Sequence, residues 1–127
     1  MAPTPLEGRG APAQGVDRLR RRQDFIAVLN EGKRVRHRLV ALGVRANGLP
    51  GTRVGYAIGK RVGPAVVRNR TRRRLREIVR ALPIAPGYDL VITGYAPSAE
   101  APFGTLRDVL TSSAKRAGIL TESLQIS

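Results

Sequence analysis

Residues 67–82 carry the pattern that most constrains the fold, because they predict a helix with two distinct faces. On a helical wheel of about 100° per residue, one group of residues shares an arc of about 120°. This arc holds Val67, Thr71, Leu75, Ile78, Val79 and Leu82. Such a stripe is typical of an amphipathic helix that packs one side against a core. The segment therefore predicts a helix docked on other elements, not an isolated one.

The rest of the same helix is unusually basic. It holds seven arginines between positions 68 and 80 and a single acid, Glu77. Like charges four residues apart, such as Arg68 with Arg72 and Arg72 with Arg76, destabilise a helix by a few tenths of a kcal/mol per pair. A face that served only solubility would intersperse glutamates with the arginines. We therefore interpret this face as a polyanion-binding surface.

The charge of the whole chain is concentrated in the same region. The 127 residues include 23 Lys or Arg and 9 Asp or Glu, for a net charge of +14. Residues 18–80 alone carry 19 bases and three acids, so the two ends are nearly neutral. Twenty of the bases are Arg, which fits either a G+C-rich coding bias or a need for bidentate phosphate contacts. A strongly basic block of this kind favours a nucleic-acid partner.

Composition also excludes several function classes. The chain has no Cys and one His, so thiol catalysis, Cys-ligated zinc and a His-based triad are not expected. Its carboxylates are not clustered as a two-metal site would require. We predict no catalytic residue and no metal ligand in the protein. His37 lies in a basic loop, where solvent or RNA contact is the expected role.

The first half of the chain predicts one helix and a group of strands. Phe25, Val28 and Leu29 share one face of a helix over residues 22–31, and Gly32 ends it. Residues 39–44 and 53–58 have strand-length apolar patterns. The turn-rich residues 47–51 between them predict a hairpin.

The second half alternates helices with a strand. Pro64 suits a first helical turn and opens the basic helix, which ends near residue 82. Residues 88–94 form a compact apolar strand, and residues 103–117 form a last helix that stops at Gly118. The fold class is therefore α+β, a single-domain α/β sandwich in the order helix, three strands, helix, strand, helix.

Two kinds of polyanionic partner, membranes and DNA, are disfavoured. The stripe of the basic helix is core-like, and no segment approaches the roughly 20 apolar residues of a membrane span, so we expect no membrane partner. A helix-turn-helix needs a partner helix across a short turn, whereas strands flank this helix on both sides. We therefore expect no DNA partner either.

Residues 59–77, with the sequence GKRVGPAVVRNRTRRRLRE, closely resemble the signature of the protein subunit of bacterial ribonuclease P. The context is similar too, since Arg22-Gln-Asp-Phe25 lies upstream and Gly87-Tyr-Asp89 lies downstream. The resemblance covers about residues 19–118. It implies the fold of the ribonuclease P protein and ribosomal S5 domain 2, with a left-handed βαβ crossover. Physics alone would favour a right-handed crossover, since about 98% are.

The resemblance also implies a function. The family's protein assists a catalytic RNA that removes the 5′ leader of precursor tRNA endonucleolytically, with divalent metal ions. The expected partners are that RNA subunit and the leader of precursor tRNA. The expected cofactor is Mg²⁺, bound mainly by the RNA, and the expected location is the cytoplasm. The alternative is a structural RNA-binding protein of ribosomal type, without a processing role.

The motif helix implies the residues that contact the RNA subunit. These are Arg68, Asn69, Arg70, Arg72, Arg73, Arg76 and Arg80. Arg68 lies at the edge of the core stripe, so it could instead hold the loop at the helix start. Asn69 could orient the arginines, approach an RNA-bound metal, or bond to the first helical turn.

A second surface implied by the resemblance is a cleft between the first helix and the sheet, which binds the single-stranded leader. The residues carried over to it are Phe25, Leu29, Leu42, Ala57, Lys60 and Arg61. Phe25 could stack on a base or pack in the core. Leu29 and Leu42 stand where the family often has aromatics, so leader binding here depends more on apolar and basic contacts.

The expected domain organisation is simple. Residues 1–17, rich in Ala, Pro and Gly, form an N-terminal tail, residues 18–119 form the RNA-binding domain, and residues 120–127 form a C-terminal tail.

Overall fold

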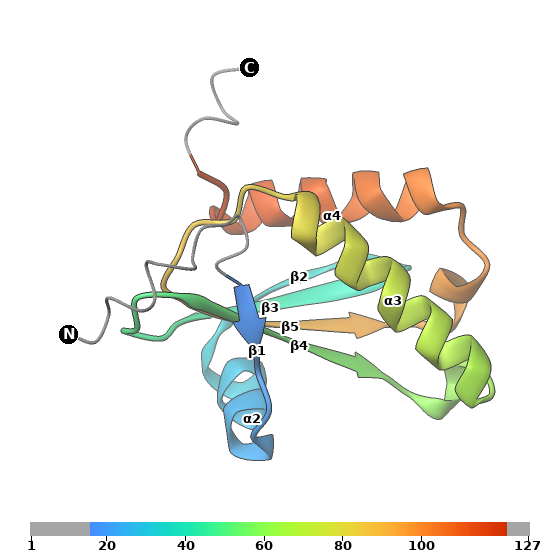
Figure 1. The fold of residues 1–127 in the computed structure, drawn as a ribbon, viewed down its shortest axis with the longest axis horizontal. Coiled ribbons are helices and arrows are strands. Elements are labelled where there is room, and N and C mark those ends of the chain that lie inside the picture. Colours follow the sequence, from blue (N-terminus) through green and yellow to red (C-terminus); the bar gives the residue numbers. More distant parts are fainter. Residues whose placement is uncertain (1–15, 122–127) are drawn as a thin grey trace.

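The structure is a computed structural model that describes residues 16–121 (Figure 1). A five-stranded mixed sheet carries helices on both of its faces. The elements follow in the order β1 (Val16–Arg18), α2 (Arg22–Glu31), β2 (Lys33–Arg36), β3 (Val40–Ala46), β4 (Thr52–Ile58), α3 (Ala65–Ala81), β5 (Tyr88–Gly94) and α4 (Phe103–Ala117). Two short 3-10 turns, η2 (Lys60–Val62) and η3 (Ala96–Ala99), follow β4 and β5. The predicted helices and the predicted fold class are confirmed.

The predicted hairpin between β3 and β4 is wrong. The strand order is β1-β4-β5-β3-β2, so β5 lies between β3 and β4. It pairs antiparallel with β3 and parallel with β4. The apolar run of β5 explains this placement, because Leu90, Val91 and Ile92 are all buried and need cover on both faces of the sheet. Residues 47–51 therefore connect two strands that are not neighbours.

The chain passes from β4 to the parallel strand β5 through α3. Figure 1 shows α3 and α4 on one face of the sheet, with β4 nearer to the viewer than β5 and both strands running in the same direction. This arrangement makes the crossover left-handed, as the family resemblance implied. It is the rare hand among such connections.

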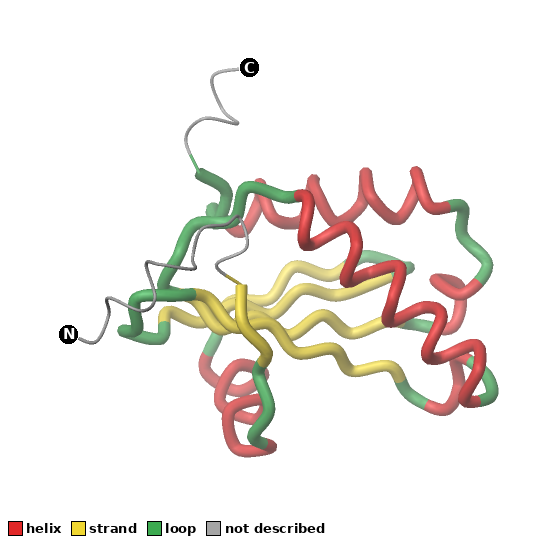
Figure 2. The backbone as a smooth tube through the Cα atoms, viewed as in Figure 1, coloured by secondary structure: helices red, strands yellow, loops and turns green. Residues whose placement is uncertain are grey.

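The main core lies between the sheet and the helix pair α3 and α4 (Figure 2). The stripe predicted for α3 faces this core, where Thr71, Leu75, Ile78 and Val79 are buried. α4 supplies Leu106 and Leu110, which are also fully covered. The strands also contribute side chains to this core. Because side chains alternate along a strand, the strand residues next to these core residues point to the opposite face of the sheet.

The opposite face carries α2 and a smaller apolar cluster. Leu19, Val28 and Val91 are buried there, and Phe25 and Ala57 pack against them. In Figure 1, α2 lies under the end of the sheet nearest β1 and leaves the far ends of the strands beyond it. The two faces of the sheet therefore offer two different surfaces.

The domain begins and ends slightly outside its predicted limits. β1 starts at Val16 and pairs with β4, so residues 16 and 17 belong to the sheet, not to a tail. Leu120 is buried and forms an isolated bridge with Ile84, so the domain extends beyond residue 119. The remaining parts of the two predicted tails, residues 1–15 and 122–127, lie outside the described residues.

A buried ion pair ties β4 to β5. The guanidinium of Arg53 donates to both carboxylate oxygens of Asp89, at 2.8 and 2.6 Å, and Asn47 donates to the same carboxylate at 2.9 Å. Burial raises the pKa of the Asp89 carboxyl, but these hydrogen bonds outweigh burial and hold the pKa below its usual value. Arg53 also lies 3.7 Å from Asp24 of α2, so it connects that helix to the sheet.

Candidate RNA-binding surfaces

The basic helix α3 begins at a turn that its own arginine stabilises. Gly63 has a φ of 146°, which side-chain-bearing residues rarely adopt, and Pro64 follows it as the N-cap. The Nε of Arg68 donates to the carbonyl of Gly63 at 3.1 Å. Arg68 is therefore partly buried and holds the loop at the helix start, which was one of its two predicted roles.

Asn69 orients a neighbouring arginine. Its side-chain oxygen accepts a hydrogen bond from Nη1 of Arg72 at 2.9 Å, one turn further along α3. Of the roles predicted for Asn69, this contact supports the one that positions the arginine face. The two residues form one polar unit on the surface of the helix.

The other predicted arginines project from α3 to different degrees. Arg70, Arg73 and Arg80 are exposed, and Arg72 and Arg76 are partly covered. Only Arg80 has an acidic neighbour on the helix, with 3.8 Å between its Nη1 and Glu77 and both side chains mostly exposed. An exposed pair at this distance contributes little. α3 therefore presents a face of largely uncompensated positive charge, as predicted.

Arg74 differs from the other arginines of α3. Its guanidinium donates to the backbone carbonyls of Ser98, Ala99 and Ala101, with the closest contact at Ala101. These carbonyls belong to η3 and the segment after it, which leads into α4. Arg74 thus fixes the connection between β5 and α4, and it is not part of the exposed basic face.

Phe25 lies between α2 and the sheet, where the cleft was predicted. A Cβ atom on Gly55 of β4 would lie 2.3 Å from the tip of its ring, so the ring packs directly on this glycine. The ring is only partly buried, and Ala57 lies two residues further along the same face of β4. Phe25 packs in the small cluster and still keeps exposed surface, so both roles predicted for it stay open.

Two leucines were predicted to line the same cleft, and the structure separates them. Leu29 is 37% exposed, and its side chain lies 3.8 Å from the Cβ position of Gly43 on β3, which fits the prediction. The prediction is wrong for Leu42, which is 2% exposed and belongs to the main core. The alternation of β3 places Leu42 on the face covered by α3 and α4, opposite the cleft.

Lys60 and Arg61 lie in η2, which follows β4 after Gly59, and both are exposed. η2 packs against α3 and η3, so the structure places these two residues beyond the end of β4 and not beside α2. Two further exposed cations lie on the face of the sheet that carries α2, on the edge strand β2. Val35 packs against the main core, so its neighbours Arg34 and Arg36 point to the face that carries α2. Sequence reasoning missed these two residues, although the alternation KRVR contained the signal.

Residues 16–121 contain no group of three or more His, Cys, Asp or Glu side chains that could hold a metal ion. No helix in that part of the chain is long and apolar enough to span a membrane. The site is therefore made of guanidinium groups, amide groups and apolar side chains, which can bind and orient a polyanion.

The fold and its two basic surfaces define a small α/β protein built to bind nucleic acid. Comparison with known proteins narrows this class. The ribonuclease P family model matches residues 14–118. The chain therefore belongs to the ribonuclease P family.

Individual relatives agree with the family match. The ribonuclease P protein component of Caldanaerobacter subterraneus subsp. tengcongensis is 36% identical over 107 residues, which cover 83% of this chain and 92% of the relative. The solved ribonuclease P protein of Thermotoga maritima aligns with a TM-score of 0.72 and 32% identity, over 79% of this chain and 96% of that one. The Staphylococcus aureus ribonuclease P protein, at 23% identity and a TM-score of 0.74, covers 82% of this chain and 97% of its own and supports the fold.

As a protein component of ribonuclease P, the chain takes part in tRNA processing as a subunit of a ribonuclease. The predicted function is confirmed at this level. The alternative of a structural protein of ribosomal type is not favoured.

Proposed function

We propose that this chain assists a catalytic RNA in removing the 5′ leader from precursor tRNA, with the chemistry residing in the RNA. The observation that carries the proposal is the character of α3. Its outward arginines are well placed to bind RNA, whereas no carboxylate or imidazole cluster accompanies them within residues 16–121. In this proposal the holoenzyme works in the cytoplasm.

The two faces of the sheet divide the RNA contacts between them. On one face, the exposed part of α3 binds the RNA subunit through Arg70, Arg72, Arg73, Arg76 and Arg80. On the other, the surface beside α2 binds the single-stranded leader. There the ring of Phe25 and the side chain of Leu29 offer apolar contact to bases. Lys60 and Arg61, in η2 beyond the end of β4, offer charge to phosphates.

Mg²⁺ in this proposal is bound mainly by the RNA. Among residues 16–121 the buried carboxylate is Asp89, and it is already held by Arg53 and Asn47, so it is not free to take a metal ion. The remaining donors of the described residues do not gather in one place. The chain's own part is to bind and position RNA and to offset the repulsion between RNA strands.

Reconstitution with the cognate catalytic RNA tests this proposal. At low Mg²⁺ concentration, adding the protein should accelerate leader removal from precursor tRNA compared with the RNA alone. The protein without RNA should leave the substrate intact. Cleavage by the protein alone would contradict the proposal, as would a rate with the RNA that the protein does not change.

A further inference from the structure

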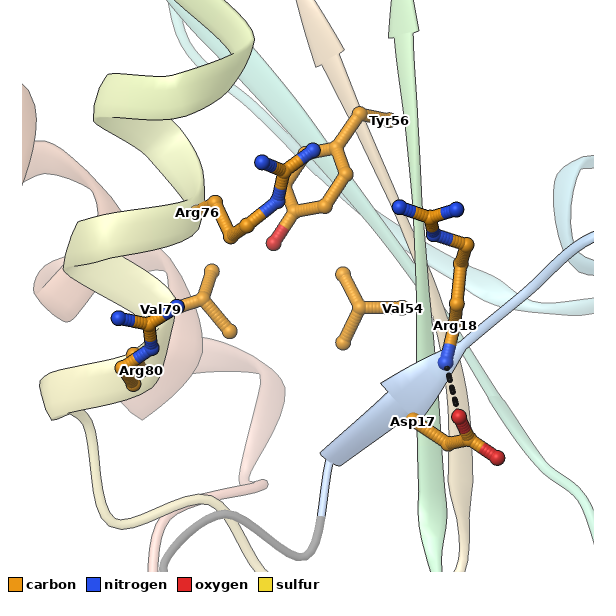
Figure 3. A pocket seen from close by; sticks show the side chains of 7 residues that line it. All are labelled: Asp17, Arg18, Val54, Tyr56, Arg76, Val79 and Arg80. Atoms are coloured by element: carbon orange, nitrogen blue, oxygen red, sulfur yellow. Dashed lines mark hydrogen bonds between the residues drawn. The ribbon is translucent and has the colours of Figure 1, made fainter.

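A pocket at the border of the proposed α3 surface opens between β1, β4 and α3 and shares Arg76 and Arg80 with that surface (Figure 3). Its volume is about 260 Å³. It is lined by Asp17, Arg18, Val54, Tyr56, Arg76, Val79 and Arg80. Pockets for drug-sized ligands occupy about 300–1,000 Å³, so this one suits a single small unit and not a folded segment.

Three guanidinium groups border the pocket from two elements. Arg18 comes from the edge strand β1, and Arg76 and Arg80 come from successive turns of α3. The one acid in the lining, Asp17, accepts a hydrogen bond from the backbone N–H of Arg18 at 2.8 Å. The lining therefore keeps a net positive charge, which favours an anionic ligand.

Apolar side chains form the inner wall of the pocket. Val54 and Val79 face it from the sheet and from α3, and the ring of Tyr56 stands beside them (Figure 3). The guanidinium of Arg76 lies over this ring, 5.9 Å from its centre. A free phosphate makes no favourable contact with apolar side chains, whereas a planar base packs well against aliphatic and aromatic side chains.

Tyr56 adds a polar group that is free to bind a ligand. Its hydroxyl forms no hydrogen bond with any residue of the described part of the chain, and it points toward the space between Val54 and Val79 (Figure 3). Burial raises the pKa of the Tyr56 hydroxyl to about 12, although Arg76 and Arg80 pull it down. The phenol is therefore neutral at physiological pH and can donate to an anion without repelling it.

We propose that this pocket binds one unstacked nucleotide of the catalytic RNA, with the base against Val54, Val79 and Tyr56 and the phosphate on Arg18 and Arg80. The choice of the catalytic RNA rests on the proposed function and on position. The pocket lies on the face of the sheet that carries α3, opposite the surface proposed for the leader. A nucleotide placed there would continue the RNA contacts of α3 onto β1.

Binding of adenosine 5′-monophosphate to the full chain, followed by NMR of the Tyr56 ring, tests the pocket directly. The nucleotide should shift these resonances in a saturable way. Adenosine and inorganic phosphate, each at matched ionic strength, should bind at least about tenfold more weakly because each lacks half of the contacts. Equal binding of phosphate and nucleotide would overturn the assignment of a nucleotide.

Two variants connect the shifts to the proposed contacts. Arg18→Ala should weaken nucleotide binding about tenfold, which is the effect of losing one charge-assisted hydrogen bond. Tyr56→Phe keeps the ring and should weaken nucleotide binding about threefold. Arg116→Ala, which removes an exposed guanidinium from the distant helix α4, should leave it unchanged. Wild-type affinity in Arg18→Ala would overturn the proposal.

The source of the nucleotide is tested in the holoenzyme. Arg18→Ala should weaken binding of the catalytic RNA about tenfold and leave the preference for leader-bearing tRNA over mature tRNA unchanged. Loss of that preference with normal RNA binding would assign the pocket to the leader and overturn our assignment.

Nucleotide binding by the free chain does not depend on leader removal. A chain that binds the nucleotide without stimulating cleavage would therefore contradict only the proposed function. A chain that stimulates cleavage without binding the nucleotide would contradict only the proposed pocket.

Discussion

Replacing Arg53 with Met should destabilise the domain strongly at neutral pH and only weakly in acid. The substitution keeps the aliphatic part of the side chain and removes both hydrogen bonds to Asp89, which is 0% exposed. Removing one partner of a buried ion pair costs about 3–5 kcal/mol because the other charge is left without compensation. The Arg53 side chain is 29% exposed, so solvent moderates the loss and we expect about 3 kcal/mol at pH 7.

The pH dependence follows from the pKa of Asp89. In the native protein this pKa lies below its usual value, so the ion pair stabilises the fold above the unfolded pKa of about 3.9 and ceases to do so as pH falls through the folded value. Without Arg53, burial dominates and raises the folded pKa, so the variant loses stability as pH rises. The difference between the two proteins should therefore be largest at neutral pH, shrink as pH falls through the raised pKa of Asp89 in the variant, and vanish below its lowered pKa in the wild-type protein.

Urea unfolding at a series of pH values measures this difference as a free energy of unfolding. Arg107→Met serves as the control, because it breaks an exposed pair with Asp108, 3.7 Å apart, and should cost less than about 1 kcal/mol at every pH. A loss for Arg53→Met that is the same at every pH would refute the reasoning, since the loss would not depend on the charge of Asp89.

Three further substitutions test other parts of the structure. Arg72→Ala should weaken binding to the catalytic RNA and reduce the slope of log affinity against log salt by about one unit. The control Arg107→Ala, on α4, should change neither the affinity nor the slope. An unchanged slope for Arg72→Ala would show that Arg72 is not in the interface. Gly55→Val should force the ring of Phe25 off β4 and lower stability by about 1–3 kcal/mol in thermal unfolding, and a variant of native stability would contradict that packing. Arg74→Met should cost about 1–3 kcal/mol, because carbonyls of the segment before α4 lose their charged donor, and an unchanged melting temperature would show that this contact is not needed.

Local patterns predicted the helices well because their signals lie within a few residues. The stripe of α3 repeats at helical spacing, and the residues that form it are the ones buried against the sheet. Residues 22–31 and 103–117 behave in the same way, with Gly32 and Gly118 as their C-caps. In these segments the periodicity and the end signals agree, and tertiary packing adds nothing that changes the result.

The sheet was harder to predict because strand order depends on contacts distant in sequence. A turn between two apolar runs favours a hairpin locally, but β5, whose Leu90, Val91 and Ile92 are all buried, pairs between β3 and β4. β1 was missed because three residues, Val16–Arg18, carry no usable alternation. The left-handed crossover came from the family resemblance and could not be derived from general rules.

The part of the site that consists of clustered charges was predicted from the sequence. The parts that depend on how the strands pair and which face each helix covers were not. The arginines of α3 are visible in the sequence, whereas Leu42 was assigned to the wrong face because alternation alone does not say which face α2 covers. Tyr56 and Arg18 meet only through the parallel pairing of β1 with β4. No sequence pattern connects them.

In the proposed function, the two faces of the sheet serve two different RNAs. This division is tested most directly by the ratio of holoenzyme affinities for leader-bearing and mature tRNA, measured with Phe25→Ala. Loss of a stacked ring costs roughly 1–3 kcal/mol, so this ratio should fall about tenfold, while affinity for the catalytic RNA stays at its wild-type value. Equal losses for both tRNAs, or a loss confined to the catalytic RNA, would contradict the division between the two faces.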